Sequence, residues 1–334
     1  MVNVSVSPHI RSRLTTSIVM VDVAIALLPA LLMGVFVFGL RALLVIAVTV
    51  AACLLTEYVY RRLMKLPNTL SDGSALVTGL ILAMNMPASV PLWVPVLGSV
   101  FAIGLVKQLF GGLGQNIMNP ALAARCFLLI SFPALVGGSI PAVGNLFDGN
   151  LWQGFLSRMT TATVDATSTA TPLQLLKDGG TVDLLQAFLG LHSGCIGETS
   201  TLAILLGGVY MVWRGVISPR IPVVYVVSAC LCIGCMRWLS VGAMPSANYL
   251  LGQACTGGLM AGAVFMATDY VTSPITPAGQ WIYAILLGLL TALFRVFGSY
   301  AEGVSYAIVI GNTVVPLIEK VTLPRPFGKR GAAR

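Results

Sequence analysis

Apolar residues form ten long runs along this chain, separated by short polar or charged segments. A helix needs about 20 mainly apolar residues to cross the hydrocarbon core of a bilayer, and most of the runs approach that length. The pattern therefore predicts about ten membrane-spanning helices in two groups of five. The expected spans are 17–40, 42–60, 74–90, 92–110 and 120–136, followed by 199–213, 221–239, 250–271, 280–298 and 303–319.

The longest polar interval, 137–198, lies between the two groups of spans. The first apolar run begins near Ser17 and is too long for the apolar core of a cleavable signal peptide, so we expect it to be the first span. The predicted division is a polar tail (1–16), a first transmembrane half (17–136), an extramembrane segment (137–198), a second transmembrane half (199–319) and a basic tail (320–334).

A faint internal repeat relates the two halves. Leu76–Pro91 aligns with Leu259–Pro274, which superimposes Gly79 on Gly262 and matches both terminal prolines. Five spans in each half would make the halves inverted with respect to the membrane, as in many transporters. Glycine and proline are frequent in membrane helices, so chance similarity is the alternative interpretation.

Composition supports a membrane protein, because 57% of the residues are hydrophobic and only 9% are charged, against about 25% charged in soluble domains. The net charge of +8 is explained by orientation in a membrane rather than by nucleic-acid binding, since basic residues gather on the cytoplasmic side. With both termini in the cytoplasm, fourteen basic residues lie inside and five outside, so segment 137–198 is expected to be non-cytoplasmic. The five are Arg41, Arg158, Lys177, Arg237 and Arg295.

Motifs of soluble enzymes are missing from the sequence, and we assign no catalytic residue and no metal ligand. The only histidines are His9 and His192, which excludes a haem held between two histidines inside the bundle. Cys230, Cys232 and Cys235 form a Cys-x-Cys-x-x-Cys cluster within one span. An iron–sulfur centre needs a fourth ligand, so buried small apolar residues are the favoured interpretation.

Ionisable residues within apolar runs are costly and therefore point to function. Asp22, Asp269 and Glu302 are the candidates for an ion path. The alternative is that such residues mark span ends or extend to the membrane surface. The same two interpretations apply to Glu57, Lys107, Arg125, Glu198 and Arg295.

Two glycine-rich segments, Gly111–Asn116 and Gly194–Ser200, border the spans. Irregular backbone at membrane depth is tolerated only where it is buried in protein or lines a cavity. Such loops suit the polar edge of a planar cofactor, and simple turns between helices are the alternative.

Within the polar interval, Asp165–Pro172 reads Asp-Ala-Thr-Ser-Thr-Ala-Thr-Pro. Composition alone would make it a flexible loop. Its order resembles the flavinylation motif Asp-x-x-Ser-Gly-Ala-Thr, in which the last threonine is esterified to the phosphate of FMN. The matching residues are Asp165, Ser168, Ala170 and the acceptor Thr171, and Thr169 stands where the motif has glycine.

Further segments in the same order resemble the D subunit of the Rnf electron-transport complex, which is related to the B subunit of the sodium-pumping NADH:quinone oxidoreductase. The matching segments cover most of the chain. They are Ser71–Ala75, Val77–Gly79, Lys107–Gly114, Asn119–Ala121, Arg125–Phe132, Asp165–Pro172, Gly197–Ser200, Ala267–Asp269 and Glu302–Tyr306.

This resemblance implies a flavin-carrying subunit of a translocase in the bacterial cytoplasmic (inner) membrane. The complex would couple electron transfer between ferredoxin and NAD to sodium or proton transport. It also implies FMN on Thr171 at the periplasmic face, a non-covalent riboflavin, a second subunit with covalent flavin among the partners, and a flavin transferase for maturation. The rival hypothesis is an inverted-repeat solute transporter or channel without a redox cofactor, and a purely scaffolding subunit is a third.

Overall fold

The computed structural model describes residues 15–137, 171–242, 245–298 and 303–324, which form helices and turns and no strand. The first half begins with two long helices and continues with shorter ones. Among these, α4 continues directly into a π-helical segment, η2. Its elements are α1 (Thr16–Phe38), α2 (Leu40–Leu63), η1 (Leu70–Asp72), α3 (Ser74–Met84), α4 (Trp93–Val100), η2 (Phe101–Gln108), α5 (Pro120–Ser131) and α6 (Pro133–Val136).

Two short helices, α8 (Pro172–Lys177) and α9 (Leu184–Leu189), lead into the second half. There the third span is broken in the middle. The elements are α10 (Thr201–Trp213), α11 (Arg220–Val241), α12 (Ala247–Cys255), α13 (Leu259–Ala261), the π-helical η3 (Gly262–Met266), α14 (Pro277–Phe297) and α15 (Val304–Thr322).

The helix lengths confirm a polytopic helical membrane protein, but only some of the ten expected spans are single helices long enough to cross a membrane. Five helices are long and apolar enough to cross a membrane: α1, α2, α11, α14 and α15. A sixth span is counted if α12 and the α13–η3 segment, which bend by 57° at their break, are taken together. The other four expected spans are helices of 10–17 residues, namely α3, α4 with η2, α5 and α10.

Local sequence explains where several of these helices begin and end. Gly39, with φ +74°, is the only residue between α1 and α2, and glycine adopts this conformation at no steric cost. Asn119 caps α5 by accepting from the N–H of Ala121, and Pro120 follows at the first helical position, where it forfeits no hydrogen bond. Thr276 and Pro277 start α14 in the same way.

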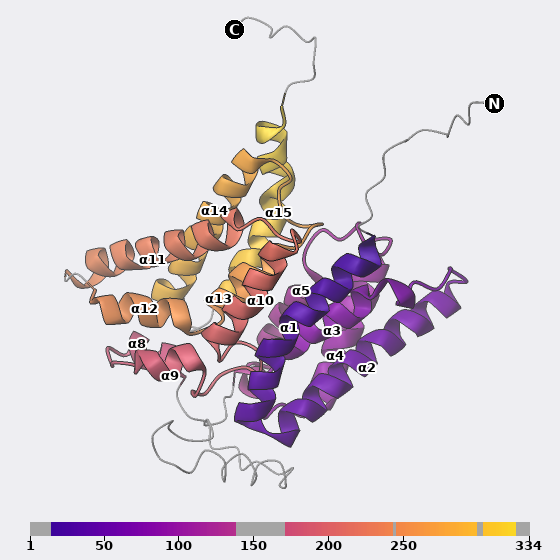
Figure 1. Ribbon diagram of the computed structural model, residues 1–334, viewed down its shortest axis with the longest axis horizontal. Helices are drawn as coiled ribbons and strands as arrows, with labels where there is room; N and C mark the ends of the chain where they lie inside the picture. Colours follow the sequence, from indigo (N-terminus) through magenta and orange to yellow (C-terminus); the bar gives the residue numbers. More distant parts are fainter. Residues whose placement is uncertain (1–14, 138–170, 243–244, 299–302, 325–334) are drawn as a thin grey trace, which may run out of the picture.

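The two halves meet along α1 and α10, which run antiparallel. Asp22 near the start of α1 contacts Arg214 just after α10, and Ala26 one turn further along α1 lies against Gly207. The corresponding first helices thus point in opposite directions, as inverted halves require. The start of α1 and the end of α15 lie at one end of the bundle, and α8 and α9 lie at the other (Figure 1).

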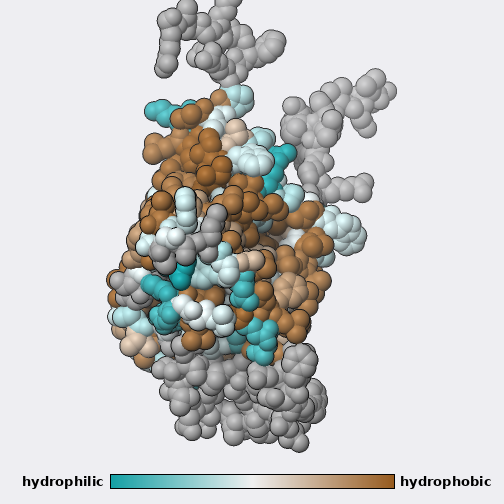
Figure 2. All heavy atoms as spheres, turned by 90° about the vertical axis from the view of Figure 1, so that its left-hand side faces the viewer, coloured by the Kyte–Doolittle hydropathy of each residue, from teal (hydrophilic) through white to brown (hydrophobic). Residues whose placement is uncertain are grey.

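Large apolar side chains on the outside of the bundle indicate the surface that faces lipid. Examples are Leu32 on α1, Val209 on α10 and Leu231 on α11. Figure 2 shows hydrophobic residues over the upper part of the α11 side of the molecule, with hydrophilic residues gathered towards the end that holds α8 and α9. This division matches a membrane-embedded body with a polar end.

Candidate functional site

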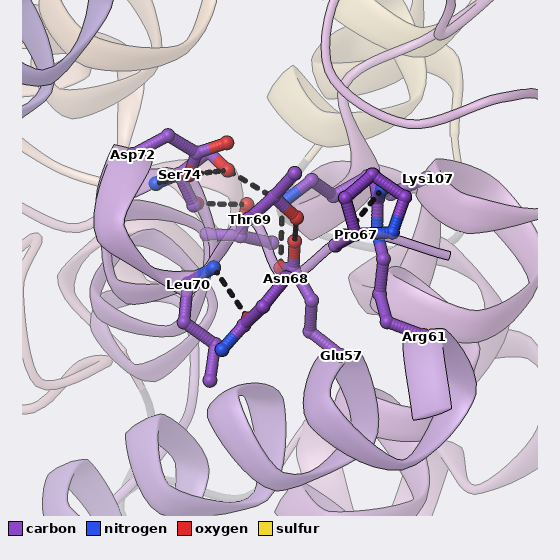
Figure 3. A network of polar contacts seen from close by, with 10 residues as sticks. Glu57, Arg61, Pro67, Asn68, Thr69, Leu70, Asp72, Ser74 and Lys107 are labelled. Atoms are coloured by element: carbon purple, nitrogen blue, oxygen red, sulfur yellow. Dashed lines mark hydrogen bonds and ion pairs between the residues drawn. The ribbon is translucent and has the colours of Figure 1, made fainter. Parts of the chain in front are cut away.

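Lys107, near the end of η2, lies at the centre of a buried polar network (Figure 3). Its Nζ donates to Glu57 Oε2 on α2 at 2.7 Å and to Ser74 Oγ at the start of α3 at 2.6 Å. The other Glu57 oxygen accepts from Thr69 Oγ1 at 2.7 Å, and Ser74 Oγ donates to Asp72 Oδ1 at 2.5 Å. Lys107 and Glu57 are therefore a hydrogen-bonded buried pair, and neither side chain extends to solvent.

The π-helical geometry of η2 helps to place this lysine. A π-helical turn holds an extra residue and changes the face that the following side chains present, and such turns are frequent at functional sites. The bond from Leu109 N to Gly104 O, 3.1 Å long, closes one of these wider turns around Lys107. The network consequently joins α2, α3 and η2 near the end of the bundle where α1 begins, because Ser17 donates to the carbonyl of Ser71 there.

A second buried cation, Arg125 on α5, connects the first half to the segment that precedes α10. It donates to Asn85 Oδ1 at the end of α3 and to Cys195 Sγ at 3.6 Å, and it lies 3.8 Å from Glu198 Oε2. Glu198 Oε1 in turn accepts from the N–H of Cys195 at 3.3 Å. The cavity beside this centre measures only about 10 Å³, which is room for one water at most.

The segment Gly194–Ser200 fills the space at the end of α3 with its own backbone. Ile196 N donates to Met86 O at 3.0 Å, and Gly197 N donates to Met84 O at 2.9 Å. A Cβ at Gly197 would collide with the Met84 side chain, so only glycine permits this approach. The segment is thus a packed connection before α10, which agrees with the interpretation of irregular backbone buried in protein.

A third buried cation, Arg295 on α14, binds the break between α12 and α13. Its two terminal nitrogens donate to the carbonyls of Gln253, Thr256 and Gly257, and to the Gln253 side-chain oxygen at 2.9 Å. The last carbonyls of a helix have no partner within the helix and attract positive charge. Arg295 therefore satisfies the acceptors that the broken span exposes.

Thr171, the predicted flavin acceptor, caps the short helix α8. Its side chain is half-buried, and its Oγ1 accepts from the N–H of Gln174 at 3.3 Å. Leu173 and Leu176 of α8 are buried. The end of Leu173 approaches Gly257, just after α12, and the end of Leu176 approaches Gly252 within α12. α8 is thereby held against the second half.

The similarity of this chain to known proteins extends over almost its whole length. A family model described as the NQR2, RnfD, RnfE family matches residues 3–328. The chain belongs to this family.

Three relatives show how far the similarity reaches. The D subunit of the Na(+)-translocating ferredoxin:NAD(+) oxidoreductase complex of Acetobacterium woodii is 46% identical over 97% of this chain and 95% of its own length. The D subunit of the proton-translocating ferredoxin:NAD(+) oxidoreductase complex of Clostridium ljungdahlii is 40% identical over 98% of this chain and 96% of its own. The D subunit of the ion-translocating oxidoreductase complex of Actinobacillus succinogenes is 38% identical over 96% of each chain.

The two described candidates for an ion path in this family member have different hydrogen-bond partners. Asp22 is buried and bound by Arg214, whose nearest nitrogen is 3.1 Å away, and by the hydroxyl of Tyr210 at 3.0 Å. Asp269 lies in the turn between η3 and α14, where it accepts from Thr272 Oγ1 at 3.1 Å. Glu302, Asp165, Ser168 and Ala170 lie outside the described residues, as do the segments 1–14 and 325–334.

Sequence reasoning missed two members of the Arg125 centre, Asn85 and Cys195. Asn85 is a polar residue inside an apolar run, flanked by methionines, and that contrast was the available signal. Cys195 is the one cysteine of the polar interval 137–198 and lies in the glycine-rich segment Gly194–Ser200, and that position was the available signal. Of the cysteine cluster on α11, Cys235 is exposed while Cys230 and Cys232 are half-buried, and the described residues contain no group of three metal-binding side chains.

His192 is a titratable residue in a turn outside the spans. His192, between α9 and α10, places Nδ1 3.0 Å from the carbonyl of Ser193, and its enclosed Nε2 has no partner among the described residues. This burial lowers the pKa of His192 below its ordinary value of 6.5, because a charged ring loses its hydration there.

Proposed function

We propose that this chain is the membrane-embedded D subunit of an ion-translocating ferredoxin:NAD oxidoreductase complex and that it carries FMN as a phosphoester on Thr171. The observation that carries the proposal is the similarity over nearly the full length to relatives bearing that name, 46% identical in one case. The flavin assignment has separate support in the order Asp165-x-x-Ser168-x-Ala170-Thr171.

The surroundings of Thr171 fit a covalent attachment. Its Oγ1 acts as a hydrogen-bond acceptor in the α8 cap, and an ester oxygen keeps an acceptor lone pair after the hydroxyl proton is lost. The half-buried side chain leaves room for a group to leave the helix at its first turn. Attachment is therefore compatible with the described backbone of α8.

The chain itself contributes a fixed position for the flavin. FMN, when bound, supplies the redox chemistry by accepting and releasing electrons. Pro172, Leu173 and Leu176 are buried and seat α8, and Lys177 Nζ donates to the carbonyl of Gly298 after α14. These contacts tie the attachment point to the second half, which limits how far the tethered ring can move.

Orientation and partners follow from the same proposal. Lys107 and Arg125, counted as cytoplasmic, and Arg295, counted on the opposite side, are buried in the bundle and are removed from the count of basic residues. Twelve basic residues on the cytoplasmic side against four on the other still favour a cytoplasmic location for both termini. Thr171 is then on the periplasmic side of the cytoplasmic membrane. The proposed partners are the other subunits of the complex, one with its own covalent flavin, together with a flavin transferase, a non-covalent riboflavin, and sodium or protons as the transported ion.

The test is covalent flavin on the purified chain, made together with a flavin transferase. We expect the denatured wild-type protein to fluoresce under ultraviolet light in a gel and Thr171→Ala to be dark. Thr169→Ala, two residues earlier, is the matched control and should fluoresce. Mass spectrometry of the peptide containing Thr171 should show the added mass of FMN less water.

Fluorescence that persists in Thr171→Ala would refute the assignment of this residue. A colourless wild-type protein without visible flavin absorption would instead favour a solute transporter or channel without a redox cofactor. Recovery of other subunits with the tagged chain from its own membranes tests membership of the complex independently of the flavin.

A further inference from the structure

A basic hollow lies at the end of α2, apart from the flavin attachment point. It encloses about 480 Å³ and is lined by Tyr58, Arg61, Arg62, Lys65, Leu66 and Asn68. Three of these six residues are cations and none is an acid. The volume falls in the range of small-molecule sites, so the hollow is large enough for a phosphate group and the atoms attached to it.

The three cations differ in how they are held. Arg61 is half-buried and donates from NH1 to the carbonyl of Pro67 at 3.2 Å (Figure 3). Arg62 and Lys65 are exposed. Lys65 has φ +55°, the only positive φ outside glycine in the described part of the chain. This left-handed conformation closes the end of α2, where Leu66 N donates to the carbonyl of Arg61 at 2.9 Å, a common way for a helix to end.

Exposed apolar side chains lead along α2 to the lining of the hollow. Leu55 lies one helical turn before the lining residue Tyr58, and Val59 lies one turn before the lining residue Arg62; both are exposed. Leu66, which is also exposed, lines the hollow itself. A strip of exposed aliphatic side chains along a spanning helix faces hydrocarbon, so it leads from the bilayer to the three cations.

This combination selects among possible anions. An acidic protein or a soluble phosphate would meet the cations from the aqueous side and would make no contact with the aliphatic strip, which faces hydrocarbon. A phospholipid covers both parts at once, with its phosphodiester on the arginines and lysine and an acyl chain along α2. Basic pockets at the ends of membrane helices bind anionic headgroups in this way.

We propose that the hollow is a binding site for one anionic phospholipid. Arg62 and Lys65 contact the phosphodiester, while Arg61 stays bonded to Pro67 and adds positive charge behind it. The Tyr58 hydroxyl and the Asn68 amide are the polar groups available to a headgroup. The proposal concerns the membrane environment of the chain and holds whether or not Thr171 carries a flavin.

The experiment is a lipid titration of the purified full-length chain, followed by native mass spectrometry. The probes are dioleoylphosphatidylglycerol, dioleoylphosphatidylcholine and, as a soluble anion, glycerol 3-phosphate. Each surface charge is worth about a fivefold change in affinity for an anionic membrane lipid. We therefore expect Arg62→Gln/Lys65→Gln to bind phosphatidylglycerol about 25-fold more weakly than wild type. Arg220→Gln, which removes an exposed arginine at the start of α11, is the matched control and should bind as wild type does.

Four results would overturn the proposal. Equal affinity of wild type and the double variant for phosphatidylglycerol would show that the two cations do not bind it. Equal affinity for phosphatidylcholine would show that only the apolar strip binds lipid. Displacement of phosphatidylglycerol by glycerol 3-phosphate would make this a site for a soluble anion. Weakening of wild-type binding by salt supports the proposal without any variant, and salt-independent binding contradicts it.

Discussion

The buried pair of Lys107 and Glu57 predicts that loss of the lysine alone is far more damaging than loss of the pair. In Lys107→Met, the Glu57 carboxylate stays buried and keeps only its bond from Thr69. Removing one partner of a buried pair costs about 3–5 kcal/mol, because the remaining charge is uncompensated. In Lys107→Met/Glu57→Gln, neither charge of the buried pair remains.

The magnitude follows from the two bonds that Lys107 donates, at 2.7 Å to Glu57 and 2.6 Å to Ser74. Hydrogen bonds to charged groups contribute about 1.5–3 kcal/mol each, which gives about 3–6 kcal/mol for both and agrees with the estimate for a broken pair. We expect the single variant to lose about 3–5 kcal/mol of unfolding free energy, and the double variant to recover about 2 kcal/mol or more of it.

The assay is denaturant titration of the purified chain in detergent micelles, followed by tryptophan fluorescence. Lys177→Met is the control, since this partly buried lysine donates to one backbone carbonyl and is not paired with a carboxylate in the described residues. Its loss should cost about 0.5–1.5 kcal/mol. The reasoning is refuted if Lys107→Met loses less than about 1 kcal/mol, or if the double variant is no more stable than the single one.

Three further predictions concern the neighbouring centres. Gly258→Ala should lower the unfolding temperature more than Gly179→Ala, because both have positive φ but only the Cβ at 258 would strike the Glu198 carboxylate; equal shifts in a thermal melt would contradict this. Arg295→Gln should destabilise the chain by about 3 kcal/mol, since it strips donors from buried carbonyls of the broken span, and a denaturant titration matching wild type would disprove it. Burial lowers the pKa of His192, so the unfolded chain binds a proton at this residue more readily than the folded chain does. The contribution of His192 to the free energy of unfolding is therefore complete above about pH 6.5 and is lost as the pH falls. His192→Asn should therefore show a smaller drop in melting temperature from about pH 8 to about pH 5, and parallel pH curves for the two proteins would argue against it.

The sequence was sufficient for the class of fold and for the positions of the apolar segments. Runs such as 17–40 and 280–298 correspond to α1 and α14, because length and hydropathy alone determine whether a helix can span a membrane. It was not sufficient for helix length. The run 250–271 contains Thr256, Gly257 and Gly258, and hydropathy does not register the break that Arg295 stabilises from another helix.

The polar centres were predictable as single residues and not as partners. Lys107, Glu57, Arg125 and Arg295 were all recognised as costly within apolar runs, yet their contacts join distant positions, fifty residues apart in the case of Lys107 and Glu57. Pairing of that kind depends on how helices pack, which a single sequence does not specify. The acceptor Thr171 is the reverse case, because its prediction rests on an ordered motif and its cap position on α8 was not foreseen.

The arginine at the break has a consequence for how the chain is made. Residues 247–266 leave the ribosome before Arg295 does, so the carbonyls of Gln253, Thr256 and Gly257 enter the membrane while the helix that supplies their donors is still being synthesised. We expect the bent segment to settle only when α14 lies beside it, and the second half to mature as a unit. A chain that stops before residue 277 lacks the side chain that binds these carbonyls.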